Sequence, residues 1–312
     1  MKRTLDEKYH NVDIIEKIKD NNYLDVYESK IELCFYNNSN NKLYDNINSE
    51  FKEQIYSISV SAIQDKICIC MLNKKNVKIF DYDIEEEILE LNKEEIKDNS
   101  VTDINHFYKC IQISKNVFIT GDDKYITIWS YNFNNFLEVK KIEINTITCD
   151  LLLSNDEYFI SSQPQNETLR LFDKNNYELL KIISNIDCIN STNSLIKSNK
   201  YILINCNKGF GIFDIITKEL IQYIEYNNLE YNRISCDEQN TIYVLNIKKK
   251  NQNNNEESVL KIMIGNIIEK EFTFIKDYEE ITCNYEKLNL SCLENNILLL
   301  WNNDVVYSSK EI

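Results

Sequence analysis

The sequence predicts an all-β protein built from seven repeated units, and three observations support this. Short β-rich segments recur along the 312 residues, and each ends in an aromatic or apolar residue that Asp, Asn or Ser usually follows. Successive ends lie 36 to 51 residues apart, and strands with a period near forty are typical of propeller blades. A further apolar strand follows most ends, which gives four strands per period. The expected ends are Tyr44-Asp45, Phe80-Asp81, Trp129-Ser130, Phe172-Asp173, Phe213-Asp214, a degenerate one near Ile264, and Trp301-Asn302.

The clearest repeat covers residues 116–129, where two alternating β-branched runs flank a tight turn with Gly121 and Asp122. This combination predicts a β-hairpin. An Asp or Asn six residues before the terminal aromatic recurs in four repeats, and Asn suits such turns as well as Asp does. The four pairs are Asp123 with Trp129, Asn166 with Phe172, Asn207 with Phe213, and Asn295 with Trp301.

This segment resembles a WD40 repeat, whose inner hairpin ends in Trp-Asp or a similar pair, and Asp123 occupies the place of the family's turn aspartate. The Gly-His dipeptide that precedes each blade in the family is missing, and with it we expect the His–Ser–Trp–Asp hydrogen-bond network to be missing. The chain is therefore similar to a divergent member of the WD40-repeat family. The resemblance implies a seven-bladed β-propeller with four antiparallel strands per blade, which holds protein partners.

Residues 23–312 are expected to form this one propeller, preceded by an N-terminal arm of residues 1–22. The arm is either an amphipathic helix or an added strand that closes the ring, and 305–309 is the candidate closing strand at the other end. The expected blades are about 23–55, 56–92, 104–143, 146–184, 187–225, 230–275 and 280–309.

The sixth blade is the least regular, because the polar stretch 248–258 interrupts it. Either this insertion extends the hairpin, or the blade ends at Leu245-Asn246 and the later strands are shifted. With three lysines followed by Asn and Glu, the insertion has the composition of a mobile loop.

Composition excludes several classes of function. The net charge of −15, from 50 acidic and 35 basic residues, disfavours independent nucleic-acid binding, which depends on clustered Lys and Arg. Most of the ten cysteines lie in apolar runs without C-x-x-C spacing, and only two histidines occur, so we expect no metal and no cofactor. Residues 1–20 carry no secretory signal and no apolar run is long enough for a membrane span, which favours a cytoplasmic or nuclear location.

No catalytic residue is expected. Carboxylates are plentiful, but a Ser or Cys triad has no candidate base. The G-x-G of residues 209–211 lies in a predicted hairpin and lacks the helix that phosphate binding needs. A propeller hydrolase is therefore the disfavoured alternative.

Non-enzymatic scaffolding, as an adaptor subunit of a multiprotein complex, is the expected function. By the resemblance, loops between the second and third strands and between blades would meet other proteins, and an acidic face could receive basic peptides. No small-molecule substrate is expected. The alternative is a ribosome-associated scaffold similar to the receptor for activated C kinase. The residues expected on this face are Asp122, Asp123, Glu167, Lys208, Asp237, Glu238 and Glu294.

Overall fold

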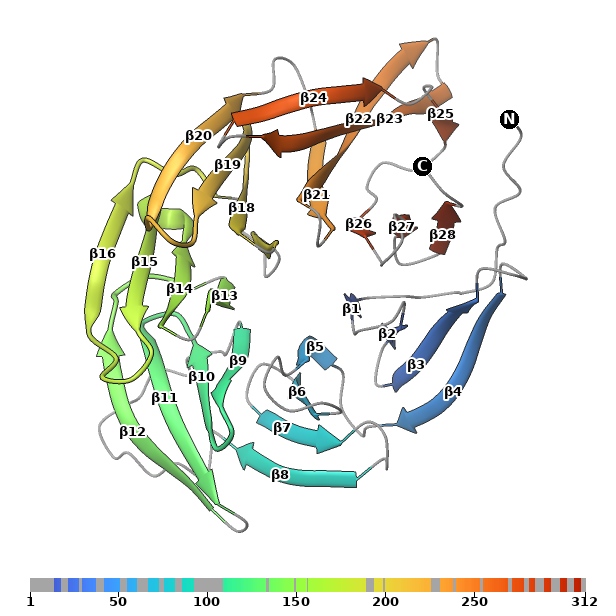
Figure 1. Ribbon diagram of the computed structural model, residues 1–312. Coiled ribbons are helices and arrows are strands. Elements are labelled where there is room, and N and C mark those ends of the chain that lie inside the picture. The colour runs from blue at the N-terminus through green and yellow to red at the C-terminus, as the bar shows by residue number, and fades with distance from the viewer. Residues whose placement is uncertain are drawn as a thin grey trace. The chain divides into compact units, whose positions relative to one another are not determined.

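The computed structural model of the chain is nearly all-β, and its described elements are antiparallel strands and a short 3-10 helix, Pro164–Asn166 (Figure 1). The structure describes the strands between Ile14 and Asn92 and those between Ile281 and Ser309. Between these two groups it describes residues 109–132, 135–148, 150–155, 157–188, 194–198, 200–225, 231–237, 240–252, 255–268 and 271–277.

Within the described residues, the strands form separate antiparallel sheets, most of them with four strands in chain order. The first three are β1 (Ile14–Lys17), β2 (Asn22–Tyr27), β3 (Lys30–Asn37), β4 (Lys42–Glu50); β5 (Ile55–Val60), β6 (Ile67–Leu72), β7 (Asn76–Asp81), β8 (Glu86–Asn92); and β9 (Lys109–Ser114), β10 (Val117–Gly121), β11 (Tyr125–Asn132), β12 (Asn135–Glu143). The next two are β13 (Asp150–Leu153), β14 (Tyr158–Gln163), β15 (Thr168–Asp173), β16 (Leu179–Ser184); and β17 (Leu195–Lys197), β18 (Tyr201–Cys206), β19 (Gly209–Asp214), β20 (Glu219–Glu225).

The last two sheets depart from four strands. One contains β21 (Tyr231–Cys236), β22 (Thr241–Gln252), β23 (Asn255–Ile268) and β24 (Glu271–Asp277), and β25 (Ile281–Cys283) also pairs with β23. The other has three described strands, β26 (Asn289–Cys292), β27 (Leu298–Trp301) and β28 (Val306–Ser309). The expected all-β class and the antiparallel four-stranded sheets are thus confirmed, and they match a WD40-like propeller. The blade boundaries stay a prediction, and the first sheet already begins at Ile14, in a strand and not a helix.

A β-bulge recurs where the third strand of a sheet pairs with the fourth. One extra residue lies on the fourth strand, directly after the partner of a recurrent position on the third strand. In three sheets this position is Trp129, Phe172 or Phe213, each buried to 5% exposure or less. The same irregularity occurs at Phe80 of β7, Cys34 of β3 and Gly265 of β23. The aromatic segment ends seen in the sequence therefore mark a repeated structural position.

The expected first segment end, Tyr44-Asp45, was wrong. Tyr44 lies on β4, the fourth strand of its sheet, and pairs with Phe35 of β3. The bulge places the equivalent position at Cys34. The short apolar thiol lacks the aromatic signal that identified the other ends, and the neighbouring tyrosine supplied a false one.

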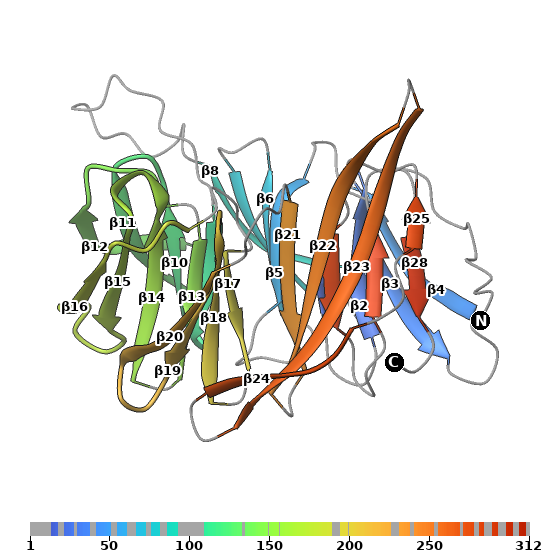
Figure 2. The same ribbon diagram turned by 90° about the horizontal axis from the view of Figure 1, so that it is seen from above.

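The insertion at 248–258 extends the hairpin, so the expectation of a mobile loop was wrong. Strands β22 and β23 pair continuously up to Gln252 opposite Asn255, as a long two-stranded ribbon (Figure 2). The register sets Lys250 opposite Glu257 in this ribbon.

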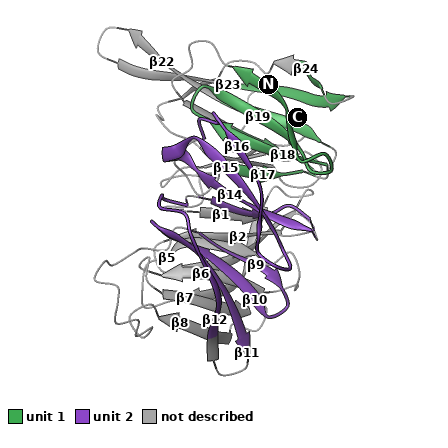
Figure 3. Cartoon of the chain, turned by 90° about the vertical axis from the view of Figure 1, so that its left-hand side faces the viewer, with its two compact units in different colours: residues 1–12, 19–21, 195–312 green, residues 13–18, 22–194 purple. Residues whose placement is uncertain are grey.

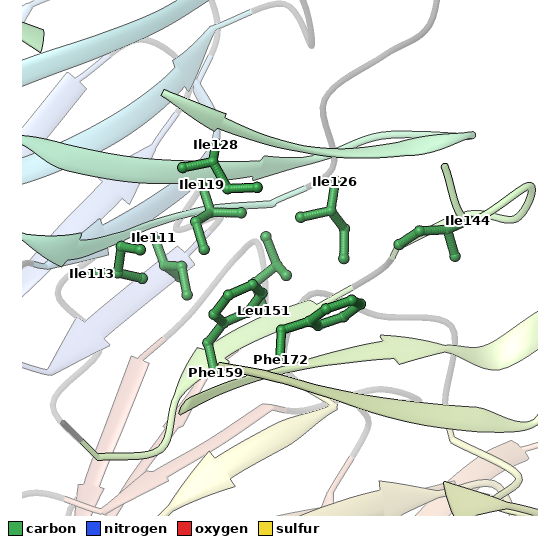
Figure 4. Packing of buried hydrophobic residues seen from close by; sticks show 9 residues of the cluster. All are labelled: Ile111, Ile113, Ile119, Ile126, Ile128, Ile144, Leu151, Phe159 and Phe172. Carbon is green, nitrogen blue, oxygen red and sulfur yellow. The ribbon is translucent and has the colours of Figure 1, made fainter. Parts of the chain in front are cut away.

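The chain divides into two compact units (Figure 3): unit 1 contains residues 1–12, 19–21 and 195–312, and unit 2 contains residues 13–18 and 22–194. Each has its own core. In unit 2, Phe159 and Phe172 point toward isoleucines of the neighbouring sheet (Figure 4). The unit 2 core comprises Ile111, Ile113, Ile119, Ile126, Ile128, Ile144, Leu151, Phe159 and Phe172. The unit 1 core comprises Tyr201, Leu203, Phe210, Ile212, Ile234, Cys236, Ile242, Val244 and Ile267.

Candidate functional site

The turn between β10 and β11 is held by the carboxylate of Asp122. Its Oδ1 accepts hydrogen bonds from the backbone N–H groups of Lys124 (2.8 Å) and Tyr125 (2.6 Å), and the side chain is only 4% exposed. Asp123 is half-buried. The turn aspartate is therefore Asp122, and the assignment of that role to Asp123 was wrong. Because a carboxylate that caps two amides is already engaged, Asp122 serves the fold of the loop.

Asp237 has a similar role in unit 1. Its Oδ1 accepts a hydrogen bond from the backbone N–H of Thr241 (2.8 Å), Tyr243 Oη donates to its Oδ2 (3.3 Å), and it is 6% exposed. Glu167 and Lys208 are exposed, and Glu167 has a left-handed backbone with φ of 51°. Glu238 and Glu294 lie outside the described residues.

The structure brings two of the expected binding residues to the same end of unit 2. The backbone N–H of Thr148 donates to Asp122 O (3.1 Å), and Thr146 Oγ1 donates to Gln165 Oε1 (3.4 Å). The loop 144–148 therefore contacts both the turn that carries Asp123 and the turn that carries Glu167. Lys208 and Asp237 belong to unit 1.

Part of the family's side-chain network is present after all. The indole Nε1 of Trp129 donates to Thr120 Oγ1 at 2.9 Å, and both side chains are buried. The expectation that the whole network would be missing was therefore wrong for this pair. The Gly-His dipeptide is not needed for it, because the bond joins two adjacent strands of one hairpin.

A buried chain of polar side chains joins the first strands of successive sheets in unit 2. Lys109 Nζ lies 3.8 Å from Asp150 Oδ1, and their side chains are 10% and 3% exposed. Ser194 Oγ donates to Asp150 Oδ2 (3.5 Å) and lies 2.9 Å from Ser162 Oγ. Sequence analysis did not identify this group, because its only signal was a charged residue at the start of an apolar strand.

The fourth strands of two sheets in unit 2 expose aliphatic side chains. On β16 these are Leu179 (48%), Leu180 (45%) and Ile182 (48%), and on β12 they are Leu137 and Val139. Beside them on β15 lies Arg170, whose Nε is buried without a hydrogen-bond partner, and burial lowers the pKa of this guanidinium. In the sequence, Arg170 could have been noticed only because arginine is rare, since the chain has three arginines.

Among the described residues, no group of three or more His, Cys, Asp or Glu side chains is arranged to hold a metal ion. In the same part of the chain, no helix is long and apolar enough to span a membrane.

Comparisons with known proteins agree with this fold. A scan against models of known protein families finds no match. A chain of the crystal structure of the Mitotic Checkpoint Complex superimposes with a TM-score of 0.68 at 10% identity, covering 96% of this chain and 89% of that one. This likeness supports a WD40-like propeller fold. An uncharacterized protein of Acanthamoeba polyphaga mimivirus, L684, is 32% identical over 158 residues, which is 45% of this chain. The chain matches only 31% of the length of that relative.

Proposed function

We propose that the protein is a non-enzymatic scaffold or adaptor subunit of a multiprotein complex, built as a seven-bladed WD40-like propeller. The observation that carries this proposal is the match of its four-stranded sheets to a chain of a multiprotein complex. Hydrogen-bonded turns such as that of Asp122 support it further, because a rigid scaffold fixes the loops that partners contact. Cytoplasm or nucleus is the proposed location.

Affinity purification of the tagged full-length chain, followed by mass spectrometry, tests the proposal. A reproducible set of partners in fixed proportion is expected. A chain that purifies alone from its native cells, or that turns over a small-molecule substrate, would contradict it.

The exposed acidic loops are proposed as one contact for basic segments of partners. Reversing the charges of Asp123 and Glu167 to Lys should reduce partner recovery, whereas Asp122 is left intact because it holds its turn. The matched control reverses the exposed Glu219 and Glu225 of β20, which changes the net charge equally. Undiminished recovery with the first variant would exclude this contact.

A further inference from the structure

Strand β16 is the last strand of its sheet, with β15 as its neighbour on one side (Figure 1). Such an edge presents backbone N–H and C=O groups to any strand that approaches, and proteins usually protect it with charges or cover. Here the edge carries Leu179, Leu180 and Ile182, each close to half exposed, with the exposed Lys181 between them. The bulge places Leu180 as the extra residue opposite Phe172.

Strand β20 shows what a covered edge looks like in this chain. Its bulge sets Leu220 opposite Phe213 as Leu179 is set opposite Phe172, so Leu220 and Ile221 are equivalent to Leu179 and Leu180. Both are only partly exposed. On β20 the backbone N–H of Phe272 from β24 donates to Gln222 Oε1 at 2.7 Å. Strand β16 has the same apolar pattern, and in the part of the chain that the structure describes no such bond is seen from another strand to its side chains.

The side chain of Arg170 indicates which chemical groups a partner segment would carry. The register pairs Arg170 with Ser161 on one side and with Ile182 on the other, so all three share one face of the sheet. Among the described residues, no carboxylate forms an ion pair with Arg170, and its buried Nε has no hydrogen-bond acceptor. In a chain with a net charge of −15, an unpaired guanidinium of this kind calls for an acceptor from outside.

The neighbouring cation is already engaged. Lys140 of β12 donates through Nζ to the backbone oxygens of Asn176 (3.1 Å) and Tyr177 (3.2 Å), in the turn that leads into β16. This contact closes one end of the edge.

We propose that the edge of β16 binds an extended acidic and aliphatic segment of a partner protein, which adds to the sheet as a further strand. Residues that pair across strands share a face, so the residue opposite Ile182 lies on the face of Arg170. It stands two strand spacings, about 10 Å, from β15, a gap that Arg and Glu side chains bridge together. Aliphatic residues of the segment cover Leu179 and Leu180. This inference rests on the proposed scaffold function and names one partner segment.

A second copy of the chain fits this edge less well. Pairing β16 with itself would bring two copies of Arg170 to one face of the joined sheet and two copies of Lys181 to the other, and like charges repel on both faces. Three half-exposed aliphatic side chains also fall far short of the roughly 800 Å² per partner that a stable interface buries.

Fluorescence anisotropy with the full chain tests the proposal. The probe is a labelled nine-residue peptide of alternating valine and threonine with a central glutamate. The control peptide is identical except for a central glutamine. The glutamate peptide should bind about tenfold more tightly. Arg170→Met should remove this difference, Ile182→Lys should weaken both peptides, and Lys200→Met, which removes one exposed charge from unit 1, should change neither.

Equal binding of the two peptides, no binding of either, or an equal loss with Lys200→Met would overturn the proposal. So would a dimer in sedimentation that Ile182→Lys dissociates, because the occupant would then be a second copy. Urea unfolding of each variant confirms that it is folded. If the peptides fail while partners still co-purify with the chain, the edge inference falls and the scaffold function stands.

Discussion

The indole of Trp129 and the hydroxyl of Thr120 form a buried hydrogen bond of 2.9 Å between β11 and β10. Phe118 stacks on the same indole with ring centroids 6.3 Å apart. The bond holds the side chain of Trp129, which lies at the β-bulge between β11 and β12, against strand β10. From the sequence, the side-chain network to which this bond belongs was expected to be missing.

Thr120→Val should destabilise the protein by about 1–3 kcal/mol, because the buried indole N–H loses its acceptor. Thr127→Val, at the cross-strand partner of Thr120, is the matched control and should cost less. Urea unfolding followed by tryptophan fluorescence measures both. Equal losses for the two variants would show that the indole bond contributes nothing of its own.

Lys109→Met should destabilise unit 2 by about 3–5 kcal/mol, because it leaves the buried Asp150 without its cation. Adding Asp150→Leu in the same chain should recover much of this loss, since no buried charge then remains unpaired. Calorimetry of the single and double variants measures the coupling. Additive losses would contradict a buried ion pair.

Asp122→Ala should cost about 2 kcal/mol, because two turn amides lose a charged acceptor. Asp123→Ala should change stability little, since Asp123 is half-exposed and Asp122 holds the turn. Thermal unfolding compares the pair. A larger loss at Asp123 would restore the assignment made from the sequence.

Alkaline pH should reduce the stabilising effect of Tyr131. Burial raises the pKa of its phenol, and the hydrogen bond from Gln112 opposes this less strongly. Because the folded pKa lies above the unfolded value of 10.0, the contribution is complete below pH 10 and is lost as the pH rises through the folded pKa. The stability difference between the wild type and Tyr131→Phe should therefore narrow above pH 10 in urea titrations. A constant difference would contradict this.

The sheets could be predicted because β-branched runs alternate and end in a buried aromatic residue, as at Trp129 and Phe172. Cys34 shows where this fails, since the repeated position depends on a bulge and not on residue type. The ribbon of β22 and β23 was one of two alternatives for the sixth blade, and the polar composition of residues 248–258 also suggested a mobile loop, so only the register of the pairing decided between them.

The binding surface was less accessible to sequence analysis. An acidic turn residue can face a partner or cap its own turn, and only the hydrogen bonds of Asp122 and Asp237 distinguish the two roles. Likewise, Arg170 becomes informative only when the register sets it beside Ile182 and no carboxylate of the described residues forms an ion pair with it.

The central claim is that the sheets assemble into one seven-bladed propeller that holds protein partners. A crystal structure of the full-length chain tests it most directly. The account predicts seven sheets arranged around one axis, with the sheet of β26, β27 and β28 completed to four strands. Two separate lobes, or sheets that share no common axis, would contradict it.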